Sequence, residues 1–295
     1  MIDSRCGLPC TGCPWKESHG CGGCIETNGN PFYGECPIAQ CCQGKGLTHC
    51  GECNVMPCEE LYEYSYLDPE HGDKPQGKRV ENTRRWAAES GKHKWRKVLL
   101  TDSGWYSDYT EFSKRTVKQG ILDRFLSMLE KPAAQTRVLF IPTAAHRFEY
   151  YPAAGACFAE LLSAGIMPNN IKIHDIDGTL TLEEAMAFDV IYVTGGNTRH
   201  LLNRIKEFKF DEIIKQMVYA NKVYVGASAG SLIATPNIGD PYDKEISGLC
   251  LINAYITVHC EEGTEAKTDL PLPHIPLTDN QAVEVRWDGY EIIEG

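Results

Sequence analysis

The hydrophobic positions follow a regular alternation from about residue 97 to residue 227. Short apolar runs, typical of buried strands, alternate there with stretches whose apolar residues recur every three or four positions, as in amphipathic helices. The predicted strands are Val98–Thr101, Val138–Pro142, Ile171–Ile176, Val190–Thr194 and Val223–Ala227, and the predicted helices include Gln119–Leu129, Ala153–Ser163 and Phe210–Ala220. This alternation predicts an α/β domain with a parallel sheet covered on both faces.

After Ser247 the pattern changes to strands without intervening helices. The predicted strands are Tyr255–His259, Ile275–Thr278, Ala282–Trp287 and Tyr290–Ile293. Asp-Asn at 279–280 and Asp-Gly at 288–289 are turn signals between successive strands. We therefore expect the chain to end in an antiparallel meander.

The segment before residue 70 is poor in apolar residues and rich in cysteine. Eleven of the fourteen cysteines fall between Cys6 and Cys58, and three Cys-x-x-Cys pairs lie among them. Disulfides do not persist in a reducing compartment, so thiols at this spacing favour metal binding, with zinc as the expected metal and an iron–sulfur cluster left open. The predicted ligands are Cys6, Cys10, Cys13, Cys21, Cys24, Cys36, Cys41, Cys42, Cys50, Cys53 and Cys58.

These patterns divide the chain into three parts. Residues 1–70 are expected to form a cysteine-rich metal-binding module, residues 71–96 a polar linker or surface helix, and residues 97–295 the α/β domain. The sequence is compatible with a homodimer as well as with a monomer.

Composition and charge exclude several classes of protein. With 42% hydrophobic and 23% charged residues in 295, the chain is able to bury a core and is not disordered. No apolar run approaches the length of a membrane span, and the first residues lack a signal-peptide pattern, so we expect a cytoplasmic protein without a membrane partner. A net charge of −11 opposes binding to nucleic acid, whose phosphates attract Lys and Arg.

A strand, a Gly-x-Ser-x-Gly turn and an apolar helix start follow one another around Ser228. This order is typical of a nucleophile elbow, in which a strained serine stands above the sheet edge between residues that must be glycine. The amide of Ala229, at the helix N-terminus, is a candidate donor to an oxyanion. Gly196, after the preceding strand, is the candidate second donor. The competing interpretation is a tight turn with serine as a helix N-cap.

A nucleophilic serine needs a base and an orienting acid. His259 ends a predicted strand, whereas His274 lies among prolines, so His259 is the preferred base. Asp240 and Asp243, on the segment between the elbow helix and the last strands, are the candidate acids. Glu245 and Glu261 are weaker candidates.

Several motifs together resemble a known family. Val-Thr-Gly-Gly-Asn-Thr at 193–198, Gly-Ala-Ser-Ala-Gly-Ser at 226–231 and the strand ending at His259 resemble the serine peptidases that include aspartyl dipeptidase (dipeptidase E) and cyanophycinase. Phe-Ile-Pro-Thr-Ala-Ala at 140–145 and Lys-Val-Leu-Leu-Thr-Asp-Ser-Gly at 97–104 extend the resemblance. Separately, Cys-Gly-Leu-Pro-Cys at 6–10 and Cys-Gly-Glu-Cys at 50–53 resemble a cysteine-rich prokaryotic domain family of unassigned function.

The peptidase resemblance implies a flavodoxin-like fold, related to class I glutamine amidotransferases. It also implies Ser228 as nucleophile, His259 as base, Asp240 as acid and Gly196 in the oxyanion site. The implied substrates are small peptides, aspartyl dipeptides among them, and no cofactor is implied for catalysis. We therefore expect a serine peptidase fused to a metal-binding module. The alternatives left open are a metal- or ligand-sensing protein with a peptidase-like binding domain, and acyl transfer to an amine by the same residues.

Overall fold

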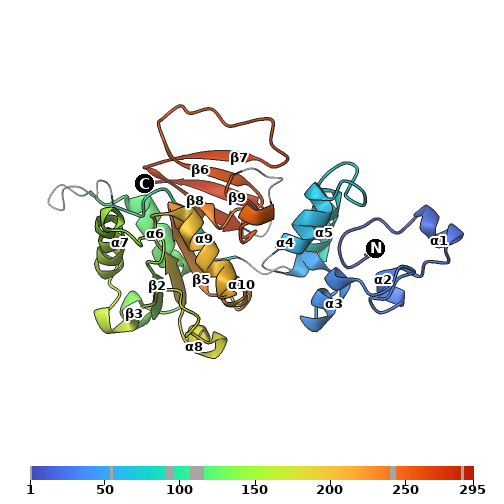
Figure 1. Cartoon of the computed structure of the whole chain (residues 1–295), viewed down its shortest axis with the longest axis horizontal. Coiled ribbons are helices and arrows are strands. Elements are labelled where there is room, and N and C mark those ends of the chain that lie inside the picture. The colour runs from blue at the N-terminus through green and yellow to red at the C-terminus, as the bar shows by residue number, and fades with distance from the viewer. Residues whose placement is uncertain (1, 54–55, 91–95, 107–115, 240–243, 287–288) are drawn as a thin grey trace. The chain divides into compact units, whose positions relative to one another are not determined.

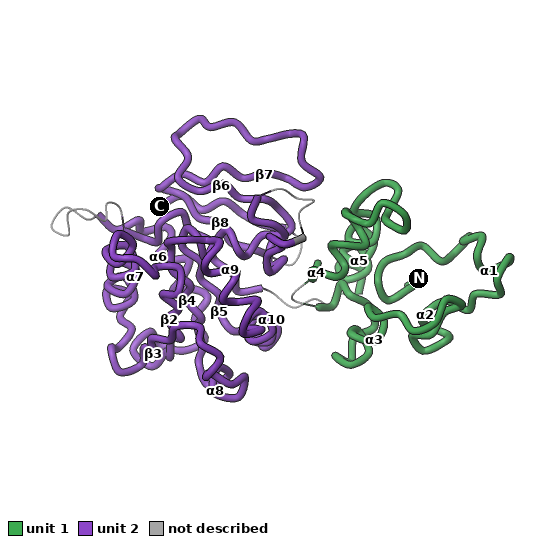
Figure 2. The backbone as a smooth tube through the Cα atoms, in the orientation of Figure 1, with its two compact units in different colours: residues 1–95 green, residues 96–295 purple. Residues whose placement is uncertain are grey.

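The computed structural model describes residues 2–53, 56–90, 96–106, 116–239, 244–286 and 289–295. The chain separates into two compact units, residues 1–95 and residues 96–295 (Figure 2). In the described part of the chain, no helix combines the length and the apolar character needed to cross a membrane.

A seven-stranded mixed sheet forms the centre of the larger unit (Figure 1). Its strand order is β3-β2-β4-β5-β1-β8-β9, in which the first five strands are parallel and β8 and β9 are antiparallel. The strands are β1 (Val98–Thr101), β2 (Val138–Ile141), β3 (Ile171–Ile173), β4 (Val190–Val193), β5 (Val223–Ala227), β8 (Gln281–Arg286) and β9 (Gly289–Glu294). The predicted α/β class is confirmed, with a mostly parallel sheet.

Helices connect the parallel strands and bury the sheet. They are α6 (Gln119–Met128), α7 (Tyr151–Ser163), α8 (Leu182–Met186), α9 (Thr198–Glu207), α10 (Phe210–Tyr219) and α11 (Ala229–Leu232), with short helical turns η4 (Ala133–Gln135), η5 (Phe148–Tyr150), η6 (Pro168–Asn170) and η7 (Lys244–Ile246). Phe125 of α6 and Leu161 of α7 share one core cluster with Leu99 and Tyr192 of the sheet. Neighbouring residues along a strand point to opposite faces, and Leu100 and Ile191, which adjoin Leu99 and Tyr192, are fully buried on the other face. Both faces of the sheet are therefore covered.

The C-terminal strands correct the predicted antiparallel meander. β6 (Tyr255–Cys260) and β7 (His274–Thr278) form a separate two-stranded sheet in which they run parallel, while only β8 and β9 form an antiparallel hairpin. Parallel neighbours need a long connection, and residues 261–273 provide it. The turn signals alone do not show this, because they mark where a strand ends but not which strand it joins.

The smaller unit consists of short helices around a core rich in thiols. These are α1 (Pro14–Ser18), α2 (Gly23–Glu26), α3 (Pro37–Gly44), η1 (Cys50–Glu52), α4 (Glu59–Tyr62), η2 (Glu63–Leu67) and α5 (Lys78–Ser90). Its buried cluster joins Cys24, Cys36, Cys42 and Cys50 to a few apolar residues, among them Ile38, Leu61 and Val80. Free cysteine packs as a small hydrophobic residue, so these side chains supply part of the core.

Helix α5 occupies much of the segment predicted as a linker or surface helix. Asn82 donates a hydrogen bond to the carbonyl of Gly7 at 2.8 Å, and Arg79 forms an ion pair with Asp73 at 3.1 Å. The Trp86 side chain is buried. The helix therefore packs into the smaller unit and is not a connector, although its many charged residues give it a polar sequence.

Candidate active site

Ser228 lies at a sharp turn between β5 and α11. Its backbone has φ 47° and ψ −106°, outside the conformations that a residue with a side chain normally adopts. A Cβ atom on Gly226 would lie 2.6 Å from the carbonyl carbon of Gly230, and one on Gly230 would lie 2.2 Å from the carbonyl oxygen of Val193. The two flanking positions therefore have to be glycine for the strand to turn this tightly.

His259 contacts Ser228 from the separate β6–β7 sheet. Its Nε2 atom lies 2.9 Å from the Ser228 hydroxyl oxygen. The pairing of β6 with β7 is irregular between Thr257 and Cys260, and His259 has a positive φ of 59° at this irregularity. Bulges of this kind reorient a side chain, and here the imidazole is directed at the serine.

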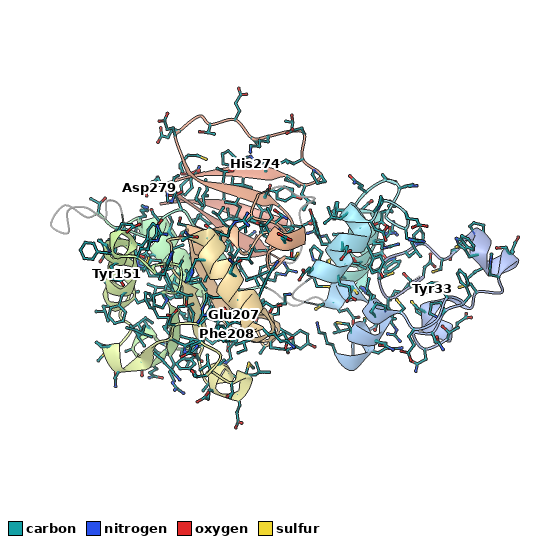
Figure 3. The ribbon with its side chains drawn as sticks, viewed as in Figure 1. Tyr33, Tyr151, Glu207, Phe208, His274 and Asp279 are labelled. Atoms are coloured by element: carbon teal, nitrogen blue, oxygen red, sulfur yellow. The ribbon has the colours of Figure 1, made fainter. Side chains whose placement is uncertain are left out.

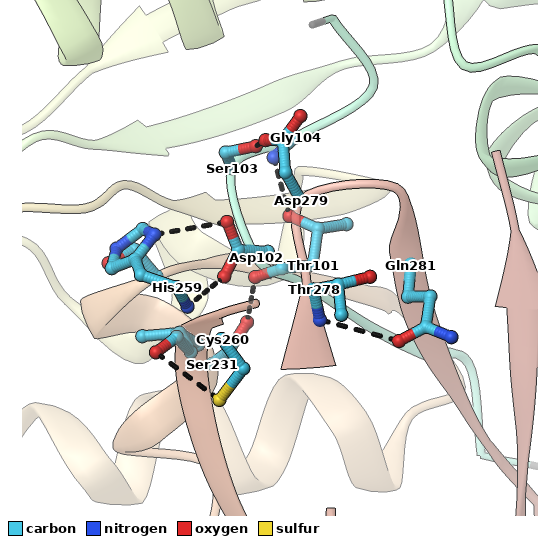
Figure 4. A network of polar contacts seen from close by, with 12 residues as sticks. Thr101, Asp102, Ser103, Gly104, Ser231, His259, Cys260, Thr278, Asp279 and Gln281 are labelled. Atoms are coloured by element: carbon cyan, nitrogen blue, oxygen red, sulfur yellow. Dashed lines mark hydrogen bonds and ion pairs between the residues drawn. The ribbon is translucent and has the colours of Figure 1, made fainter. Parts of the chain in front are cut away.

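Asp102 holds the other side of the His259 ring (Figure 4). Its carboxylate accepts a hydrogen bond from the His259 backbone amide, and its second oxygen lies 3.0 Å from Nδ1. Because a carboxylate only accepts hydrogen bonds, Nδ1 must carry a proton, which leaves Nε2 free to accept from Ser228. The hydrogen bond to Asp102 raises the pKa of His259 above its usual 6.5, with Asp279 contributing a smaller charge effect.

The predicted acids do not occupy this position among the described residues. Asp240 and Asp243 lie outside the described residues, so the structure does not place them. Glu245 is in η7, where its carbonyl accepts from Lys206, and Glu261 follows β6 on the surface. His274, on β7 (Figure 3), is 2.8 Å from the hydroxyl of Thr257 and accepts from the amide of Lys267, so it does not pair with Ser228.

Asp102 was missed by the sequence reasoning, although a signal for it existed. It follows β1 directly, and β1 pairs with β5, the strand that leads to Ser228. Polar residues at the carboxyl ends of adjacent parallel strands meet at one edge of the sheet. The acids predicted from the sequence all follow Ser228, so Asp102 is not among them.

Two backbone amides lie beside Ser228 as candidate oxyanion donors. Gly196 has φ 137°, and a Cβ atom on it would lie 2.3 Å from the carbonyl oxygen of Ala144. A Cβ atom on its neighbour Gly195 would lie 3.0 Å from the Cβ of Ser228, so this loop passes close to the serine. Ala229 begins α11. Within the described part of the chain, the amides of Gly196 and Ala229 donate to no protein acceptor.

The cysteines predicted as metal ligands carry free thiols. Burial raises the pKa of Cys10 to about 12, with further increases from Cys24 and Cys6, and burial raises the pKa of Cys58 to about 11, with Cys53 and Cys41 adding to it. Across the described ranges, no three His, Cys, Asp or Glu side chains are grouped as metal ligands would be. The thiols as placed do not fit a metal ion, and metal binding stays a prediction.

Comparison with known proteins supports both resemblances drawn from the sequence. The family described as peptidase family S51 matches residues 109–293, well over half of the chain. The family described as a protein of unknown function (DUF3795) matches residues 15–63.

Individual relatives agree with the family match. An uncharacterised peptidase of Listeria innocua is 38% identical over 104 residues, which cover 34% of this chain and 48% of that protein. A peptidase E of Shewanella amazonensis is 37% identical over 90 residues, covering 30% and 38% of the two chains. A solved structure of a candidate peptidase E from Listeria monocytogenes matches with a TM-score of 0.50 and 25% identity, covering 68% of this chain and all of that one. The chain spans about half the length of the first curated relatives it matches.

Proposed function

The chain belongs to peptidase family S51, and on that premise we propose that residues 96–295 hydrolyse small peptides through Ser228, His259 and Asp102. The observation that carries the proposal is the continuous contact from the Ser228 hydroxyl to Nε2 at 2.9 Å and from Nδ1 to Asp102 at 3.0 Å. A serine on a strained turn, a base within hydrogen-bond reach and a buried carboxylate behind the base are the groups that acyl transfer requires.

In the proposed mechanism, the Ser228 oxygen attacks the peptide carbonyl carbon and its proton passes to Nε2 of His259. Asp102 stabilises the imidazolium that results and keeps the ring in the required tautomer. The amides of Gly196 and Ala229 bind the negative oxygen of the tetrahedral intermediate. When this intermediate collapses, the C–N bond breaks and the leaving amine takes the proton from Nε2. A water molecule then attacks the acyl carbon while its proton passes to Nε2 of His259. When this second tetrahedral intermediate collapses, the bond between the acyl carbon and the Ser228 oxygen breaks, and the serine oxygen takes the proton from Nε2 as the acid product leaves.

Small acidic peptides, including aspartyl dipeptides, are the proposed substrates. This choice rests on the resemblance and on the peptidase E relative, not on a binding pocket. A library of dipeptides, assayed by the release of free amino acids, tests the proposal, with Ser228→Ala as the inactive control. We expect turnover by the wild-type protein and none by the variant. Equal release by both proteins, or no turnover of any peptide between pH 5 and 9, would exclude the proposed activity.

For the smaller unit, we propose that the Cys-x-x-Cys pairs bind a thiophilic metal such as zinc. The support is their spacing and the charge interactions within two sets of thiols, one around Cys6, Cys10 and Cys24 and one around Cys41, Cys53 and Cys58. The thiols of a set would have to move together to enclose an ion. Elemental analysis of the purified full chain tests this, with Cys10→Ser and Cys53→Ser as variants. Stoichiometric metal that falls in a variant supports the proposal, and a metal-free, folded wild-type chain excludes it.

A further inference from the structure

A buried lysine lies beside the candidate catalytic groups without being one of them. Lys118, the residue before α6, has a side chain only 3% exposed. Its Nζ atom lies 2.9 Å from the Ser103 hydroxyl and 3.0 Å from the Asp279 carboxylate, and the Ser103 hydroxyl itself donates to Asp279. A buried ammonium is costly unless it is paired, so Asp279, whose own side chain is 56% exposed, stabilises Lys118 in this position.

The three residues join the two parts of the candidate active site. Ser103 directly follows Asp102 on the loop after β1, whereas Asp279 directly follows β7, whose last residue, Thr278, pairs with Cys260 next to His259. The acid and the base therefore belong to different sheets. Lys118 connects the loop that carries the acid to the sheet that carries the base (Figure 4 shows Ser103, Asp279, Asp102 and His259).

The charges around His259 give this connection a second consequence. Two carboxylates act on the imidazole: Asp102, which is hydrogen-bonded to it, and Asp279, which acts through its charge. A second uncompensated carboxylate would raise the pKa of His259 further, and a protonated imidazole does not accept the serine proton. Lys118 also interacts with Glu160 through its charge, but burial raises the pKa of Glu160 to about 8, which favours the neutral form of that carboxyl group at neutral pH.

We propose that Lys118 is a positioning residue that pairs with Asp279 and fixes the β7 end against the Asp102 loop, so that Asp102 outweighs Asp279 in its effect on His259. This inference rests on the proposed function of Ser228 and His259. In the resting enzyme, Asp279 is the ion-pair partner of Lys118, and Asp102 is the hydrogen-bond partner of His259.

The test compares Lys118→Met, which keeps most of the side-chain volume but loses the charge, with Lys118→Arg, which keeps the charge. The readout is the pKa of His259, measured by NMR titration of histidine ring protons in a Ser228→Ala background, with His259→Gln to assign the signal. In active protein, the acidic limb of the pH dependence of kcat/KM gives the same His259 pKa. We expect Lys118→Met to raise this pKa by about 0.5–1 unit, Lys118→Arg to leave it nearly unchanged, and Asp279→Asn to lower it.

The double variant Lys118→Met/Asp279→Asn should return the pKa to near the wild-type value, because it removes both charges together. A lysine with a purely structural role would lower the rate without moving the pKa, and that result would overturn the proposal. If Lys118→Met alone does not fold, the double variant is compared with Asp279→Asn, and equal His259 pKa values in these two proteins overturn the proposal. Because the NMR titration needs no turnover, its outcome is independent of whether the peptidase activity itself is found.

Discussion

Replacing Asp102 by Asn tests the proposed triad most specifically. The asparagine oxygen is able to accept the bond from the His259 backbone amide, so the fold should persist. Its NH2 group would then face Nδ1 and favour the tautomer with the proton on Nε2, which cannot accept from Ser228. In serine peptidases this change lowers kcat by about 10⁴. The His259 side chain is 60% exposed, so water partly replaces the lost partner, and we expect a reduction of about 10³, or about 4 kcal/mol of transition-state stabilisation.

The assay is the second-order rate constant for inactivation by a fluorophosphonate, which reports serine activation and needs no known substrate. Ser228→Ala sets the background rate, and thermal unfolding verifies that the Asn variant is folded. A folded Asp102→Asn variant that reacts within about threefold of wild type would refute the reasoning, because it would show that another group orients His259. Asp240 and Asp243 would then be the next residues to replace.

Three further predictions follow from the site and the core. Gly196→Ala should lower the acylation rate about 10²-fold, because its Cβ would lie 2.3 Å from the carbonyl oxygen of Ala144 and displace the loop that carries the Gly196 amide. Gly155→Ala, whose Cβ would have no atom within 4 Å, is the matched control. Equal rates in the two variants would contradict the prediction. The inactivation rate should rise with pH through a His259 pKa above 6.5, since only the neutral ring accepts the serine proton, and a midpoint below 6.5 would contradict the raised pKa. Burial raises the pKa of Glu160 to about 8, so the native state keeps a proton that the unfolded chain releases near 4.5. The free energy of unfolding should therefore fall as pH rises from 5 to 8, by at most about 1.4 kcal/mol per pH unit. Chemical denaturation across this pH range should show a smaller fall in Glu160→Gln.

Local patterns in the sequence predict most of the larger unit. Buried parallel strands are short apolar runs, and β1 and β5 have the bounds that these runs indicate. The turn at Ser228 is also visible, because it requires glycine at fixed offsets and those glycines are in the sequence. Such features depend on residues close together in the chain, which is why sequence reasoning finds them.

Features that depend on distant contacts are harder to predict. Asp102 lies 157 positions before His259, and only the pairing of β1 with β5 and the return of β6 bring the two together. The parallel pairing of β6 with β7 depends in the same way on the path of the connection between them. In the smaller unit, the polar sequence of α5 conceals that Trp86 and Asn82 pack inside.

The identity of the nucleophile can be measured by incubating the protein with a chromogenic ester, quenching with acid and mapping the trapped acyl group by mass spectrometry. We expect the acyl group on the peptide that contains Ser228, at a level that falls sharply in His259→Gln. An acyl group on another residue, or an equal level on the Ser228 peptide when His259 is replaced, would contradict the account.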